Sequence, residues 1–373
     1  MKSYYYNIDF LRFLACISIL IFHAPLTGFF PAGISGTSIG VTFFFILAVF
    51  FTYFQVQRNI SGEEFVIKKC IRLWPVIIAS YVILAIQHYL GFITQCPQIK
   101  VILWTLAFIR DTGLTKYLNS SIDNAYLWFI GPMVCACGFY FCLFKGATDG
   151  WKGNAKLVGL IIIFLSSTCY MHSPPLISQL ALIGTSRALS GVGIGYFLAH
   201  FCEFIQRKEI MHSHTTLRKI SFTMLELLSL YYFIDILFLH YLCKPGPYIE
   251  CDALYILAFI PLIALFYCQK GYVSCLLNRR WLGILGAYSF SIYVFQYNVQ
   301  VLFFKNNILY NTKWYEACKE EHMWMSFVVF AIIIPVIVGG LIYYIVERPS
   351  VKFLTQMRKN RERKPPMLSS DAS

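Results

Sequence analysis

Long apolar runs recur along the whole chain and are separated by short polar segments. About 20 residues of α-helix cross the hydrocarbon core of a bilayer, and most of these runs have that length. The pattern predicts an all-α integral membrane protein with about ten transmembrane helices, at residues 8–26, 38–56, 73–92, 126–144, 155–171, 180–201, 221–242, 253–269, 284–304 and 325–346. A further run, residues 99–109, is too short to span, so we expect it to lie along the interface or to re-enter the membrane.

The composition agrees with a polytopic membrane protein. Hydrophobic residues make up 58% of the 373 residues, charged residues make up 13%, and the mean hydropathy is +0.62. A soluble domain of this length needs far less apolar material for its core. No linker divides the chain, so we predict one transmembrane domain over residues 1–350, followed by a basic, disordered cytoplasmic tail over residues 351–373.

The net charge of +13 would suit a nucleic-acid partner, but the placement of the basic residues argues otherwise. Of the 31 basic residues, 22 fall in segments on the same side as the N-terminus and seven on the opposite side. The other two, Arg12 and Arg187, lie inside apolar runs. Basic residues collect on the cytoplasmic side of membrane proteins. Both termini are therefore expected in the cytoplasm, where the charge would also attract anionic lipid or an anionic ligand.

The cysteines indicate no metal centre and no cofactor. Thirteen cysteines are scattered without CxxC pairs, and most fall within apolar runs. Cys243 and Cys251 flank a short outer loop and can either pair or remain thiols. The first apolar run is followed by no small-residue cleavage site, so we expect it to remain as the first helix.

Arg12 and His23 are the polar residues of the first run that a bilayer should reject. Eleven residues of α-helix return to within about 20° of one face and advance roughly 16 Å, so one face carries both side chains. Ionisable residues inside membranes usually mark function. The alternative is a snorkelling arginine that pairs with Asp9 and a histidine satisfied by a backbone carbonyl.

Two further sets of cations are candidates for binding. Lys69 and Arg72 share a face if their segment is helical and would suit a polyphosphate, although positive-inside clusters look the same. Arg187 lies within an apolar run. It can bind a substrate carboxylate, pair with Asp235, or stabilise an oxyanion, and these three roles stay open.

Five separated strings, in order, resemble the membrane-bound acyltransferase 3 family, which is typified by bacterial O-acetyltransferases of surface polysaccharides. The most specific is the family's Asp-x-x-Arg with a histidine eleven residues beyond the arginine. The resemblance covers residues 8–350. The strings are Asp9 to Arg12 with His23, Gly40 to Leu47, Lys69 to Arg72 before Pro75, Leu127-Trp128-Phe129, and Glu347-Arg348-Pro349.

The resemblance implies transfer of an acyl group, acetyl above others, from cytoplasmic acyl-CoA to a hydroxyl of a cell-surface polysaccharide or lipid-linked glycan precursor. It also implies a multi-pass protein of the bacterial cytoplasmic membrane. His23 would be the general base or an acyl-carrying nucleophile, and Arg12, the second catalytic residue, would bind the donor near the inner end. The implied binding residues for donor and acceptor are Asp9, Lys69, Arg72, Trp128, Arg187 and Tyr293. For Trp128 and Tyr293, core packing is the competing role.

The chain departs from the family pattern at three places. Ala48-Val49 stands where members carry Ser-Gly, and Lys69 stands where arginine is usual, which keeps the charge but loses the bidentate fork. Gln296 stands where members commonly carry histidine, so a titratable group becomes a neutral amide. If that histidine is essential, the activity is impaired.

Two other functions compete with the acyltransferase. One is an exporter of an anionic glycan precursor, in which Arg12, His23 and Arg187 line a path. The other is a degenerate relative that serves as a partner in polysaccharide assembly, as Gln296 suggests. Acyl-CoA consumption separates these from an enzyme, whereas the acceptor sugar and the oligomeric state stay open.

Overall fold

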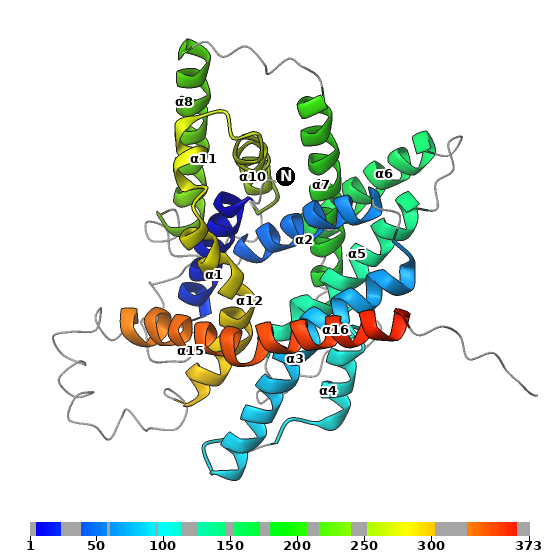
Figure 1. Cartoon of the computed structure of the whole chain (residues 1–373), viewed down its shortest axis with the longest axis vertical. Coiled ribbons are helices and arrows are strands. Elements are labelled where there is room, and N and C mark those ends of the chain that lie inside the picture. Colours follow the sequence, from blue (N-terminus) through cyan, green and yellow to red (C-terminus); the bar gives the residue numbers. More distant parts are fainter. Residues whose placement is uncertain are drawn as a thin grey trace, which may run out of the picture.

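The computed structural model describes residues 5–23, 39–57, 60–93, 96–112, 125–145, 152–171, 180–207, 216–239, 252–302 and 327–363. Within these ranges every regular element is helical, as predicted (Figure 1). The elements are α1 (Tyr6–His23), α2 (Ile39–Gln57), α3 (Gly62–Tyr89), α4 (Ile99–Leu106), η2 (Ala125–Phe129), α5 (Ile130–Lys145), α6 (Lys152–Met171), α7 (Leu180–Arg207), α8 (Thr216–Ile234), η5 (Asp235–Leu239), α10 (Asp252–Cys268), α11 (Tyr272–Leu277), α12 (Arg280–Gln300), η7 (Phe327–Ile333), α15 (Ile334–Ile342), η8 (Tyr343–Glu347) and α16 (Arg348–Arg363).

The helices coincide with the predicted apolar runs, because a chain in lipid must satisfy its backbone hydrogen bonds internally. In the described ranges, six helices are both long and apolar enough to cross a membrane, and further apolar helices are shorter. The count of ten spans and the cytoplasmic termini stay predictions. The short run near residue 100 forms α4, which folds back along α3: Trp74 donates to the main-chain oxygen of Leu106 at 2.9 Å.

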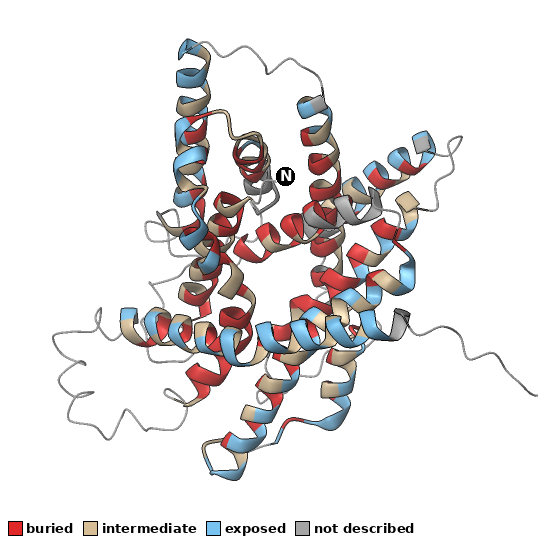
Figure 2. Cartoon of the chain, in the orientation of Figure 1, coloured by how far each residue is buried: buried red, intermediate tan, exposed pale blue. Residues whose placement is uncertain are grey.

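The outward surfaces of the peripheral helices are apolar. Figure 2 shows α8 largely exposed, whereas α1, α2 and α12 form the buried centre. The exposed side chains on α8 include Met224, Leu228 and Tyr231. Large exposed apolar surface of this kind is costly in water and suits contact with lipid. The chain is therefore built as an integral membrane protein.

The centre of the bundle is the pair α1 and α12. Tyr6 packs on Gly283 and Asp9 on Gly286, while Cys16 donates to the main-chain oxygen of Ser289 at 3.4 Å. Residue numbers thus rise together along the seam, so the two helices run in the same direction. A Cβ atom at Gly286 would lie only 2.0 Å from the main-chain oxygen of Asp9. The glycine is what permits this close approach.

The disordered tail over residues 351–373 stays a prediction, while α16 continues the last helix as far as Arg363 and packs against α3. Its half-buried positions recur every three or four residues, at Val351, Leu354, Thr355 and Arg358. Arg358 also lies 3.6 Å from Glu64 of α3. The polar composition concealed an amphipathic face. Residues 364–373 lie outside the described ranges.

Glu226 of α8 is a buried carboxylate that holds the turn before α11. It accepts hydrogen bonds from the backbone N–H of Gly271 and of Ser274, each at 3.0 Å, and from the Ser274 hydroxyl. Its exposed fraction is 0%. Because three donors share one carboxylate, this contact fixes α11 on α8.

We expect Glu226→Ala to lower the melting temperature in detergent markedly. Hydrogen bonds to a charged group contribute about 1.5–3 kcal/mol each, and the substitution leaves buried N–H groups unpaired. Thermal unfolding followed by size-exclusion fluorescence measures the shift. Glu64→Ala is the matched control, since the partly exposed Glu64 pairs with Lys68 and such pairs stabilise little. Equal melting temperatures for the two variants would contradict the assignment.

Candidate active site

Arg12 is held at the junction of α1 and α12. Its guanidinium pairs with Asp9 at 2.9 Å and donates to the main-chain oxygen of Gly286 from Nε at 3.1 Å and from Nη2 at 2.6 Å. These contacts use the Nε and Nη2 side of the guanidinium, and Nη1 has no hydrogen-bond partner among the described residues. The side chain is 14% exposed. Arg12 is thus fixed in place with donors left for an anion.

Arg12 belongs to a group that brings distant parts of the chain together, here called the arginine cluster: Asp9, Arg12, Arg72, Ser291 and Glu347. Glu347, in η8, accepts a hydrogen bond from the Ser291 hydroxyl of α12 at 2.5 Å. The same carboxylate lies within electrostatic range of Arg12 and Arg72. Four helices therefore contribute to one charged site at the end of the bundle where α1 begins.

The predicted helix across Lys69 and Arg72 is observed, since both lie in α3. Their side chains nevertheless have different neighbours. Arg72 is exposed and joins the arginine cluster, whereas the Nζ atom of Lys69 lies 5.3 Å from the centre of the Phe65 ring. Arg72 and Arg12 thus both act electrostatically on Glu347, whereas Lys69 has its described contact with Phe65 on its own helix.

His23, at the other end of α1, is buried among aromatic and amide side chains. Its ring stacks on that of Tyr126, with centroids 3.8 Å apart and planes 8° apart. Tyr293 meets it edge-on at 6.4 Å, and Gln296 lies beside it. We call His23, Tyr126, Tyr293, Gln296 and Gln300 the histidine cluster. It joins α1 and α12 at the end opposite the arginine cluster.

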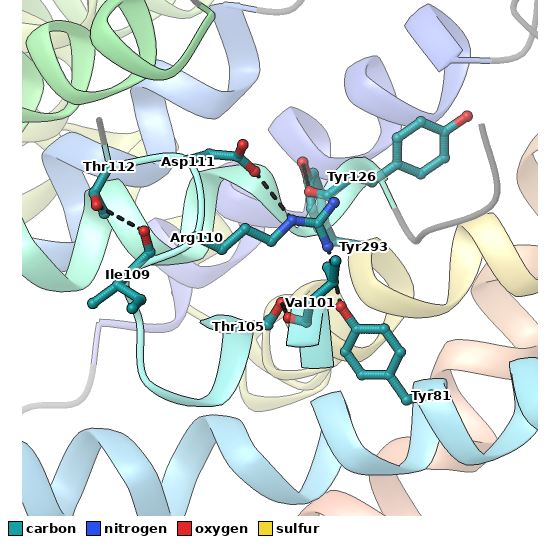
Figure 3. Close-up of polar contacts among 9 residues, drawn as sticks. All are labelled: Tyr81, Val101, Thr105, Ile109, Arg110, Asp111, Thr112, Tyr126 and Tyr293. Atoms are coloured by element: carbon teal, nitrogen blue, oxygen red, sulfur yellow. Dashed lines mark hydrogen bonds and ion pairs between the residues drawn. The ribbon is translucent and has the colours of Figure 1, made fainter. Parts of the chain in front are cut away.

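Tyr126 is itself fixed by α12, and so sets the plane of the imidazole. Its hydroxyl donates to Oε1 of Gln300 at 2.7 Å, and its main-chain oxygen accepts from the Tyr293 hydroxyl at 2.8 Å. Figure 3 shows this second contact. The histidine is therefore oriented by a residue that α12 holds twice.

Several polar atoms of the histidine cluster have no hydrogen-bond partner in the described part of the chain. They are Nδ1 of His23, both polar side-chain atoms of Gln296, and Nε2 of Gln300. The three side chains are 6%, 0% and 3% exposed. Buried polar groups are nearly always hydrogen-bonded in folded proteins. This gathering is unusual and makes the cluster a candidate ligand site.

Arg187 and Trp128 pack between helices near the same region. Arg187 donates from Nε to the Thr42 hydroxyl at 2.6 Å, and it acts electrostatically on Tyr293. No ion pair connects it with Asp235 in the described ranges, so that option is not supported. Trp128 lies edge-on to Phe45 and next to Gly184, as a packing residue does.

Arg110, one of the seven basic residues predicted on the side opposite the N-terminus, is buried at 9% exposure. Its Nε donates to the Asp111 carboxylate at 3.1 Å and its Nη1 to the Tyr81 hydroxyl at 3.1 Å. Figure 3 shows the guanidinium between these two partners. The segment after α4 thus carries a charged pair into the protein, which the sequence pattern did not reveal.

The described residues contain no group of three or more histidine, cysteine, aspartate or glutamate side chains that could hold a metal ion. The nine cysteines whose side chains the structure describes are free thiols. Cys243 and Cys251 lie outside the described ranges, so the alternative of a disulfide there stays open.

The comparison with protein families decides the class of this protein. A family model described as an acyltransferase domain, acyltransferase 3, matches residues 5–345. The chain belongs to the acyltransferase 3 family. The searches of curated proteins and of solved structures give no significant match. As a member of the acyltransferase 3 family with several apolar helices, the protein is a membrane acyltransferase.

Sequence reasoning within this family missed Tyr126 and Gln300. Tyr126 directly precedes the Leu127-Trp128-Phe129 string, and Gln300 lies four residues after Gln296, which is one helical turn. The spacing of Tyr293, Gln296 and Gln300 along one face was the available signal. The partner helices were not predictable from spacing alone.

Proposed function

We propose that this membrane acyltransferase moves an acetyl group from cytoplasmic acetyl-CoA to a hydroxyl of a cell-surface polysaccharide or lipid-linked glycan in the bacterial cytoplasmic membrane. The observation that carries the proposal is the layout of α1 and α12. These parallel helices hold the fixed guanidinium of Arg12 at one end and a buried histidine among polar groups at the other. An acyl-CoA donor with an anionic head and an acceptor hydroxyl need binding groups of these two kinds.

The arginine cluster is the proposed donor site. Coenzyme A carries phosphates, and guanidinium groups bind phosphate through charge-assisted hydrogen bonds. Nη1 of Arg12 and the exposed side chain of Arg72 supply such donors at the end predicted to be cytoplasmic. Lys69 would add charge. The slender pantetheine arm would then extend toward His23, roughly 16 Å along the helix axis.

His23 is the proposed general base. Its imidazole takes the proton of the acceptor hydroxyl while the hydroxyl oxygen bonds to the thioester carbonyl carbon. The C–S bond then breaks, and the imidazolium returns the proton to the departing thiolate. The products are an O-acetyl ester and free coenzyme A. Stacking on Tyr126 holds the ring in one plane for both proton transfers.

The test is coenzyme A release and acetyl transfer by purified protein in native lipid, with Arg72→Ala as the donor-site variant. We expect this variant to raise the KM for acetyl-CoA by about tenfold with little change in kcat, because one phosphate contact is lost. Lys100→Ala is the matched control, since Lys100 lies over Trp104 on α4. An unchanged KM would contradict the donor site. No acetyl-CoA binding by the wild type would favour the exporter or the degenerate relative.

A further inference from the structure

The unpartnered amide of Gln296 is the feature that the mechanism above leaves unused. Its side chain is fully buried and lies close enough to His23 for an electrostatic contact, but neither of its polar atoms makes a hydrogen bond of ordinary length and angle within the described ranges. A buried polar group without a partner destabilises the folded protein, because its desolvation is not compensated. A helix at the centre of the bundle therefore carries a destabilising group, and a bound ligand is the simplest source of its missing partners.

The position of Gln296 suits a reacting acyl group. It shares the face of α12 that also bears Gly286, Ser289 and Tyr293, each of which contacts α1. Both polar side-chain atoms of Gln296 and the neighbouring Nδ1 atom of His23 lack a hydrogen-bond partner. A thioester carbonyl that accepts from an amide N–H, beside a hydroxyl that donates to imidazole, would satisfy them together.

We propose that Gln296 donates the hydrogen bond that stabilises the oxyanion in this acyltransferase. Its Oε1 atom accepts a hydrogen bond from a second hydroxyl of a neutral, polyhydroxylated acceptor. This inference rests on the proposed acetyl transfer. When the acceptor oxygen bonds to the carbonyl carbon, the carbonyl oxygen gains negative charge, and Nε2 of Gln296 donates to it. When the C–S bond breaks, the carbonyl re-forms and the negative charge passes to the departing thiolate. The amide only donates a hydrogen bond and neither gains nor loses a proton.

Gln300 extends the same surface by one turn. It lies four residues further along α12, about 6 Å toward the end opposite the arginine cluster. Its Nε2 atom is unpaired, while its Oε1 atom is held by Tyr126. Arg110 is paired with the Asp111 carboxylate, whereas Arg187 donates to the neutral Thr42 hydroxyl and keeps its charge. The side chains that adjoin His23 are the phenols of Tyr126 and Tyr293 and the amide of Gln296, and such neutral groups bind sugar hydroxyls.

The experiment uses inside-out membrane vesicles that contain the full chain, supplied with radiolabelled acetyl-CoA, with label counted in extracted lipid-linked and polymeric glycans. Gln296→Met keeps the size of the side chain and removes the donor. We expect it to lower kcat about 100-fold at saturating acetyl-CoA, with an unchanged KM for acetyl-CoA. Gln296→His keeps an N–H donor, so we expect it to stay within about tenfold of the wild type.

The melting temperature separates this role from a structural one. Replacing an unpaired buried amide with an apolar side chain of similar size should leave stability unchanged or raise it. A Gln296→Met variant that loses turnover only together with stability, or that keeps full turnover, would overturn the inference while leaving the acyltransferase intact. Wild-type vesicles that transfer no acetyl group would overturn the proposed function and this inference together.

Discussion

Replacing His23 with alanine is expected to reduce acetyl transfer by about 10³-fold while acetyl-CoA still binds. Loss of a positioned general base costs about 10²- to 10⁴-fold in rate, and the proposed donor site lies at the other end of α1. The measurement is a single-turnover transfer assay combined with equilibrium binding of acetyl-CoA to the purified variant. Loss of kcat without loss of donor affinity would be the signature of a group that acts on the acceptor.

His88→Ala is the matched control for this prediction. His88 lies at the end of α3, where its Nδ1 atom is 3.0 Å from the main-chain oxygen of Ile93, away from the histidine cluster. We expect its transfer rate to match the wild type. If His23→Ala turned over normally, or if both histidine variants lost activity equally, His23 could not be the base.

Gly286→Ala is expected to lower both the melting temperature and the transfer rate strongly. Its Cβ atom would lie 2.0 Å from the main-chain oxygen and 2.4 Å from the main-chain carbon of Asp9, so the backbones of α1 and α12 must separate. Overpacking of this kind costs about 1–3 kcal/mol. The shift would also remove the carbonyl that orients Arg12. Thermal unfolding and the transfer assay, run on the same preparation, measure the two effects.

Gly138→Ala is the matched control, because it makes the same glycine-to-alanine change in another helix. Nothing lies within 4 Å of a Cβ atom at Gly138 of α5, so only the intrinsic preference changes. Alanine favours an α-helix over glycine by about 1 kcal/mol, and the variant should be as stable as the wild type or more so. A stable and active Gly286→Ala variant would show that the seam between α1 and α12 does not require contact at this distance.

The elements were predictable because apolar length and helical geometry are local properties. The alignment of Arg12 and His23 on one face followed from the helix repeat alone. Contacts between helices were not predictable in this way. Arg72 lies within electrostatic range of Glu347, which is far away in the sequence, and the periodicity of neither segment predicts the other.

Two local features were also concealed. The basic composition of α16 masked a helix that is stabilised by packing on α3, because composition reports average polarity and not its arrangement around an axis. The buried Arg110 was taken for a loop residue, since its cost is offset by Asp111 and Tyr81. A single sequence gives no sign of such compensation.

The seam between α1 and α12 has a consequence for biosynthesis. The first of these helices leaves the ribosome long before the second, so during translation α1 must enter the membrane without its eventual neighbour. The Asp9 carboxylate, one turn from Arg12 on the same helix, neutralises the guanidinium during that interval. The histidine and arginine clusters both require α12, so a nascent chain interrupted before residue 280 lacks residues that complete either site.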